Sequence, residues 1–224
     1  MASRRSATDR SAVARRVAEL TALNVQLRIE LRHVKPAVWR CLLVPERVTL
    51  AKLHGIVQAA MGWGYGHLHE FEIARQRYGT PDDDWPDSAP VIDERRVRLQ
   101  SLIEAGTKRF TYIYDFGDYW EHRIVVEDLV IPRPGATQSV LCLAGENACP
   151  PEDVGGSAGY AEFLEALNDP DHEEHNRMIT WIGGSFDPSA FNLGDTNQIL
   201  KSTKLESRWP WRDTHRTSAM HADS

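Results

Sequence analysis

Alternation of apolar and polar positions predicts where the sheet of this protein begins. Every second residue from Val25 to Leu31 is apolar and the residues between them are polar, which is typical of a strand with one buried face. Lys35-Pro36 interrupts this pattern, and a second apolar segment follows at 38–44. We therefore expect two antiparallel strands that pair as a hairpin.

The period of the pattern changes after the second strand. From Leu50 to Met61 the apolar positions recur at helical spacing, and Thr49 can cap a helix that packs across the sheet. Three glycines within five residues, at positions 62–66, end this helix. We expect a third strand from about Leu68 to Tyr78, and a surface loop over the acidic, proline-rich segment 79–92.

The central segment, TYIYDFGDYWEH at 111–122, predicts a strand, a tight polar turn and a returning strand that runs to Val130. Its turn, Asp115-Phe116-Gly117-Asp118, contains residue types that tolerate positive φ. Beyond Val130 the chain first forms loops, and helical spacing resumes at Tyr160 and continues in short segments to Leu200.

These elements predict an α+β fold. We expect an antiparallel or mixed sheet of about five strands with one packed helix, a β-grasp-like ββα start and a C-terminal helical segment. We expect residues 1–23 to form a basic tail with a short helix, and residues 202–224 to form a flexible tail. Between them lies a single domain, 24–201, with its sheet part at 24–130 and its loop and helical part at 131–201.

Composition narrows the classes of function. The formal net charge of −6 means that binding to nucleic acid would need a local basic patch. No apolar run approaches the roughly twenty residues of a membrane span, so we expect a cytoplasmic protein that does not bind membranes. Cys41, Cys142 and Cys149 are odd in number and lack CxxC spacing, which argues against a disulfide framework and a zinc knuckle.

Histidines and carboxylates form one candidate metal site. His67 and His69 lie two residues apart, so on a strand they would share a face. If the central hairpin lies beside that strand, Asp118, Glu121 and His122 could complete a divalent metal site. The alternative interpretation is that the histidines form hydrogen bonds across the sheet or cap the glycine-rich turn.

Two further groups have both a chemical and a structural interpretation. Asp115 and Asp118 could act as an acid and a base, although aspartates in short turns more often accept bonds from backbone N–H groups. Cys149 could be a reactive thiol near a helix N-terminus. Its segment, CPPEDVGG, also fits a rigid loop in which Glu152 and Asp153 cap the next helix.

Several aromatic residues could offer stacking surfaces for bases if they were exposed on one sheet face. Core packing is the commoner fate of aromatic residues on strands. The residues in question are Trp39, Trp63, Tyr65, Tyr114, Tyr119 and Trp120.

Six motifs occur together along the chain: LRHVKPAVWR (31–40), QAAMGW (58–63), HLHEF (67–71), YDFGDYWEH (114–122), CPPEDVGG (149–156) and FDPSAF (186–191). In this order they resemble the Ri-plasmid ORF-three-like family, whose small members are carried on plasmids and mobile elements and in part bear the label "TnpR-like". The resemblance covers residues 24–201 and implies no particular activity. Many members have a second cysteine where this chain has Val154, which argues here against a two-cysteine metal or redox site.

We therefore expect a non-enzymatic binding module for a protein or nucleic-acid partner of a mobile element, without a cofactor. The alternative is a metal-dependent hydrolase or nuclease-like enzyme, and a third interpretation makes the motifs purely structural. The predicted binding surface comprises Trp63, Tyr65, His67, His69, Tyr114, Asp115, Asp118, Trp120, Glu121, His122, Cys149, Glu152 and Asp153.

Overall fold

A computed structural model describes residues 23–64, 66–81, 90–132 and 139–202. The predicted N-terminal helix, Tyr65 and the predicted tail after Ser202 lie outside these ranges. Within them, no helix has the length and apolar character needed to cross a membrane.

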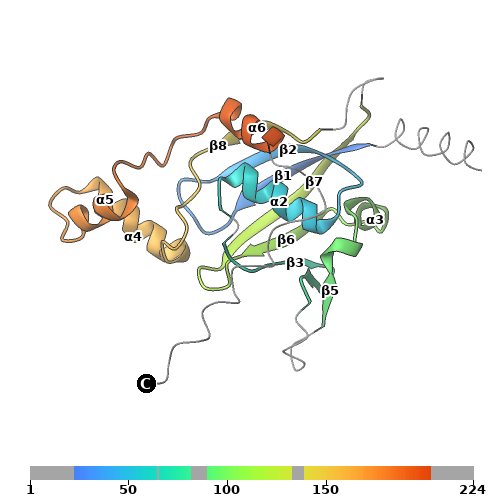
Figure 1. The fold of residues 1–224 in the computed structure, drawn as a ribbon, viewed down its shortest axis with the longest axis horizontal. Helices are drawn as coiled ribbons and strands as arrows, with labels where there is room; N and C mark the ends of the chain where they lie inside the picture. Colours follow the sequence, from blue (N-terminus) through green and yellow to red (C-terminus); the bar gives the residue numbers. More distant parts are fainter. Residues whose placement is uncertain (1–22, 65, 82–89, 133–138, 203–224) are drawn as a thin grey trace, which may run out of the picture.

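One mixed sheet of eight strands forms the centre of the described structure, with the order β5-β4-β3-β6-β7-β1-β2-β8 (Figure 1). All neighbouring strands pair antiparallel except β4 and β5, which are parallel. The strands are β1 (Asn24–Leu31), β2 (Trp39–Pro45), β3 (His69–Ile73), β4 (Gln76–Gly79), β5 (Val91–Asp93), β6 (Arg109–Tyr114), β7 (Trp120–Val130) and β8 (Leu141–Glu146).

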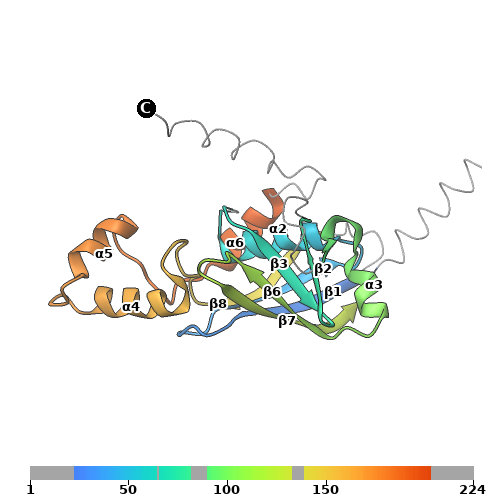
Figure 2. The same ribbon diagram turned by 90° about the horizontal axis from the view of Figure 1, so that it is seen from below.

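Helices lie on one face of the sheet and beyond the ends of its strands. Helices α2 and α6 cover one face, whereas α4 and α5 form a lobe that extends past the sheet (Figure 2). The elements are α2 (Leu50–Met61), the 3-10 helix η1 (Glu94–Arg96), α3 (Leu99–Glu104), α4 (Gly156–Asn168), α5 (His175–Ile182) and α6 (Leu193–Ser202).

The opening ββα unit follows directly from the sequence pattern. β1 and β2 pair in the register that sets Asn24 opposite Pro45, and the apolar positions of β1 are buried beneath α2. The Thr49 side chain accepts a hydrogen bond from the Lys52 amide at the start of α2, and Gly62 ends the helix in the left-handed conformation. The predicted hairpin and helix are confirmed.

The sheet is larger than the expected five strands with one helix, and the β-grasp comparison is not confirmed. The single strand expected at 68–78 is a hairpin, because Ala74 and Arg75 turn the chain with φ of 51° and 65°. The three-residue β5 and the six-residue β8 lie in segments that were expected to be loops. A strand of three residues such as β5 carries too few alternating positions to be recognised from sequence, and in β8, LCLAGE, the glycine weakens the strand pattern.

Candidate functional site

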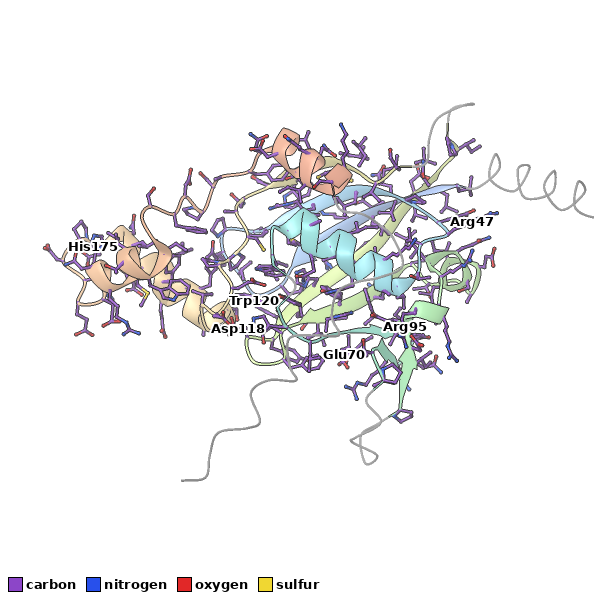
Figure 3. The ribbon with its side chains drawn as sticks, in the orientation of Figure 1. Arg47, Glu70, Arg95, Asp118, Trp120 and His175 are labelled. Atoms are coloured by element: carbon purple, nitrogen blue, oxygen red, sulfur yellow. The ribbon has the colours of Figure 1, made fainter. Side chains whose placement is uncertain are left out.

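Three segments meet near the end of β6: the loop after α2, the turn between β6 and β7, and the segment before α4. Backbone groups connect the first two, since the Asp115 amide donates to the Leu68 carbonyl over 2.8 Å. The third is attached through its Gly155 amide, which donates to Asp118 Oδ2 over 3.2 Å. Asp118 accordingly lies close to the start of α4 (Figure 3). We call this region the three-loop junction.

A tyrosine and a glutamate hold the junction together. The Tyr114 hydroxyl donates to Glu152 Oε1 over 2.6 Å and accepts a bond from the Gly66 amide over 3.1 Å. The same Glu152 oxygen accepts the Gly64 amide over 3.2 Å. Burial and the neighbouring carboxylate both raise the pKa of Tyr114, so its hydroxyl stays protonated and remains a donor.

Three aromatic side chains pack against one another in the core beside the junction. The Trp63 indole donates to the Pro150 carbonyl over 3.0 Å, and its ring lies 5.1 Å from that of Tyr114 and 5.9 Å from that of Trp120. The exposed fractions of Trp63, Tyr114 and Trp120 are all 5% or less. These members of the predicted binding surface are therefore buried core residues that position the loops.

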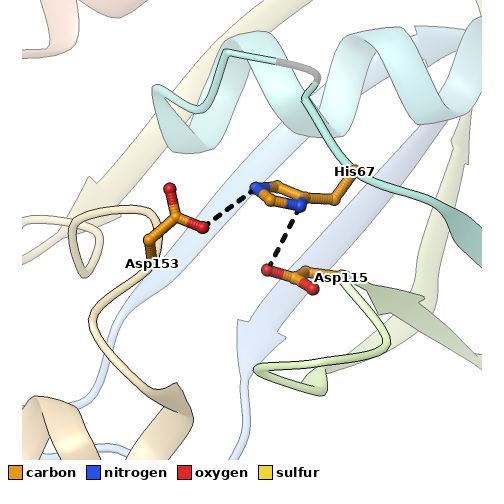
Figure 4. Close-up of side chains that lie close together, drawn as sticks. All are labelled: His67, Asp115 and Asp153. Atoms are coloured by element: carbon orange, nitrogen blue, oxygen red, sulfur yellow. Dashed lines mark ion pairs between the residues drawn. The ribbon is translucent and has the colours of Figure 1, made fainter. Parts of the chain in front are cut away.

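Three side chains converge at the solvent side of the junction (Figure 4). His67 Nδ1 lies 3.6 Å from Asp115 Oδ2, and His67 Nε2 lies 3.3 Å from Asp153 Oδ1. The side chain of Asp115 is 12% exposed, whereas that of Asp153 is 73% exposed. One ring is thus held between a buried carboxylate and an exposed one.

Local backbone geometry explains why aspartates occupy both positions. Asp115 and Asp153 have φ of 56° and 60°, in the left-handed region that aspartate tolerates better than most residues. Asp115 Oδ1 also accepts the Gly117 amide over 2.9 Å, as expected of an aspartate in a short turn. Its second oxygen, Oδ2, is left to face His67.

His69 does not join His67. β3 begins at His69, so His67 lies in the preceding loop and strand alternation does not apply to the pair. The His69 ring stacks on that of His54 with 3.5 Å between centroids, and its Nε2 lies 2.9 Å from Glu94 Oε2. Hydrogen bonding within the fold, which was the structural alternative, describes this histidine.

His122 and Glu121 do not reach the cluster either. Consecutive residues of β7 point to opposite faces, so His122 is fully buried while Glu121 lies on the open face, 3.7 Å from His33. His122 Nδ1 lies 3.0 Å from the Trp120 carbonyl oxygen, and burial lowers the pKa of the ring to about 4. The five expected metal ligands are therefore not brought together, and only His67 belongs to the observed cluster.

The environment of Cys149 does not favour a reactive thiol. Burial raises the pKa of its thiol, so the reactive thiolate is disfavoured. The loop of the alternative interpretation is present, but Glu152 and Asp153 do not cap α4, whose N-cap residue is Gly155 without a side-chain hydrogen bond. The loop carries both side chains into the junction instead, where Glu152 binds the Gly64 amide and Asp153 faces His67.

The sequence pattern predicts a pair formed by Asp115 and Asp118 and a capping role for Asp153, whereas the structure brings Asp115 and Asp153 to His67. Two aspartates with turn-forming neighbours were the only signal for the cluster, and that signal is common.

A concave surface lies away from the junction, on the face of the sheet that α2 and α6 leave open. It is a groove of about 630 Å³ whose lining includes Arg32, Arg75, Arg77, Arg109 and Arg123. Several of these charges are paired within the fold, since Arg77 lies 2.6 Å from Glu70 and Arg123 lies 2.7 Å from Glu30. Glu72 and Glu121 line the same groove. The charge of the groove is therefore mixed, whereas a surface that binds nucleic acid is predominantly positive.

The fold and the junction define a class: α+β proteins with one mixed sheet, a helix across one face and a loop cluster at the end of the central hairpin. The profile of the plasmid pRiA4b ORF-3-like protein family matches residues 24–195, and the chain belongs to this family. The resemblance seen in the six motifs is thereby confirmed.

Two relatives extend this comparison. The chain is 42% identical over 200 residues to uncharacterized protein y4hQ of Sinorhizobium fredii (strain NBRC 101917 / NGR234), covering 88% of this chain and all of the relative. The crystal structure of a protein of unknown function, MM3350, from Methanosarcina mazei Go1 is similar with a TM-score of 0.71 and 34% identity. That match covers 78% of this chain and 98% of the other.

Proposed function

We propose that this protein is a non-enzymatic binding module that recognises a protein partner at the three-loop junction. The proposal is carried by one observation: large apolar side chains stand exposed around the His67 cluster. The exposed fractions are 51% for Leu68, 45% for Phe116 and 56% for Tyr119. Aromatic side chains exposed beside a rigid loop cluster are typical anchors of protein interfaces. We call these three residues the apolar rim.

The charge beside the apolar rim indicates the chemistry of the partner. Asp115, Asp118, Glu152 and Asp153 all lie at the junction, against the single imidazole of His67. A surface of this sign attracts a basic peptide segment and repels phosphate groups. A protein partner with lysines or arginines beside an apolar contact is therefore favoured over a nucleic acid.

Comparative affinity capture tests this proposal. The bait proteins are the unchanged chain, the double variant Phe116→Ser/Tyr119→Ser, and the control Ile131→Ser, which alters an 80% exposed apolar residue that lies after β7. We expect one partner to be retained by the unchanged chain and the control but lost by the double variant. Equal recovery of every captured protein by all three baits would refute the proposed surface, provided that their melting temperatures agree.

A second candidate is the metal-dependent hydrolase or nuclease-like enzyme. It is favoured by the imidazole and two carboxylates of His67, Asp115 and Asp153, because a metal held by such ligands can activate water. The untagged protein should then cleave an activated phosphodiester in the presence of Mn²⁺, and Asp115→Asn should abolish the turnover. Turnover that survives Asp115→Asn would exclude this cluster as its source.

A further inference from the structure

We propose that His67, Asp115 and Asp153 bind one divalent transition-metal ion of the Mn²⁺ or Zn²⁺ class. This site differs from the ligand set expected from the sequence, with which it shares only His67. It requires neither the partner contact at the apolar rim nor a hydrolytic activity, so it can be tested apart from both.

The donor atoms are already near one another. One ring nitrogen of His67 and one carboxylate oxygen each from Asp115 and Asp153 all lie within 4.8 Å of one another. No other histidine, cysteine or carboxylate group of three comes this close within the described ranges. Donors on one ion are about 3 to 3.5 Å apart, given metal–ligand bonds of roughly 2.1 Å. The exposed Asp153 side chain can supply most of that closure.

The buried carboxylate needs a cationic partner. The side chain of Asp115 is only 12% exposed, and its Oδ1 is occupied by the Gly117 amide. Its Oδ2 lies 3.6 Å from His67 Nδ1, which is too long for a hydrogen bond, and among the described residues Asp115 forms no ion pair with a lysine or an arginine. A buried carboxylate without a matched cation is costly. A bound metal ion would supply the missing charge.

Both nitrogens of the His67 imidazole are directed at carboxylate oxygens, Nδ1 at Asp115 and Nε2 at Asp153. A divalent cation on Nδ1 would be bonded by the ring and by the facing Asp115 carboxylate, and the exposed Asp153 side chain can turn toward it. A mixed nitrogen and oxygen donor set suits Mn²⁺ or Zn²⁺ better than Mg²⁺.

The surrounding contacts hold the ligands in place. Glu152, the neighbour of Asp153, is bound by the Tyr114 hydroxyl and the Gly64 amide. Asp115 is bound through its own amide and through its Oδ1. Such outer contacts orient metal ligands and contribute to affinity.

Calorimetric titration of untagged, full-length, chelator-treated protein with MnCl₂ or ZnCl₂ tests the site. We expect one saturable equivalent. The affinity should fall roughly 100-fold in His67→Ala and at least tenfold in Asp153→Asn. The Asp153 side chain is 73% exposed, so Asp153→Asn should fold even if His67→Ala does not. The control His33→Ala removes a histidine that faces a single carboxylate, and it should bind metal unchanged.

Two further measurements locate the metal ion and separate its binding from the partner contact at the apolar rim. Mn²⁺ should broaden the NMR signals of His67 and Asp153 before all others, and Phe116→Ser/Tyr119→Ser should bind the metal with unchanged affinity. The proposal would be overturned if the unchanged chain showed no saturable binding. It would also be overturned if His67→Ala and Asp153→Asn both bound the metal as tightly as the unchanged chain. His67 would then act as an ion-pair partner that joins two loops.

Discussion

Acidification should destabilise this protein through His122. The ring is fully buried, with an edge-on contact to Trp63 at 5.2 Å between ring centroids, and its Nδ1 faces the carbonyls of Tyr112 and Trp120. Burial lowers the pKa of His122 from 6.5 to about 4. Between these values the unfolded chain binds a proton that the folded chain does not, so stability falls as the pH falls from 6.5 to 4.

The size of the effect follows from the shift in pKa. From 6.5 to about 4 is 2.5 pKa units, and at 1.36 kcal/mol per unit the full loss is about 3 kcal/mol, of which about 2.5 kcal/mol is lost by pH 4.5. The contribution is complete above pH 6.5 and absent well below pH 4. Burial lowers the pKa of His54 as well, so that ring adds a loss of the same sign.

Urea unfolding at pH 7 and pH 4.5 measures this loss. All other titrating groups are shared between the unchanged chain and His122→Phe, so the difference between the two losses isolates His122. We expect the unchanged chain to lose about 2.5 kcal/mol more than the variant. Equal losses would refute the reasoning, as would an imidazole NMR signal of His122 that titrates near pH 6.5.

Two other substitutions test the junction. Gly156→Ala should destabilise the fold by about 2 to 4 kcal/mol, because a Cβ there would lie 2.4 Å from the Asp118 carbonyl oxygen at φ of 68°. Gly183→Ala has a similar φ of 76° with open space around it, so chemical denaturation should show a loss of only about 1 kcal/mol. Tyr114→Phe removes the donor to Glu152 and should cost about 1 to 3 kcal/mol in the same assay; an unchanged midpoint would show that this bond does not hold the loops.

The sequence by itself determined the start of the sheet and the family. Strict alternation from Val25 to Leu31 and helical spacing from Leu50 to Met61 leave one way to bury both apolar faces, which is to pack them together. Turn chemistry likewise located the hairpin around Asp115. Such elements are specified by contacts between near neighbours in the chain, so a local pattern records them.

Only the tertiary structure decided the site. His67, Asp115 and Asp153 come from three segments that are joined by bonds between the loops, and no spacing along the chain encodes that meeting. It also decided which side chains are available, since His122 is buried and Asp153 is exposed. Burial depends on what packs against a residue from distant parts of the chain, and the charge and hydrogen bonding of each group follow from that packing.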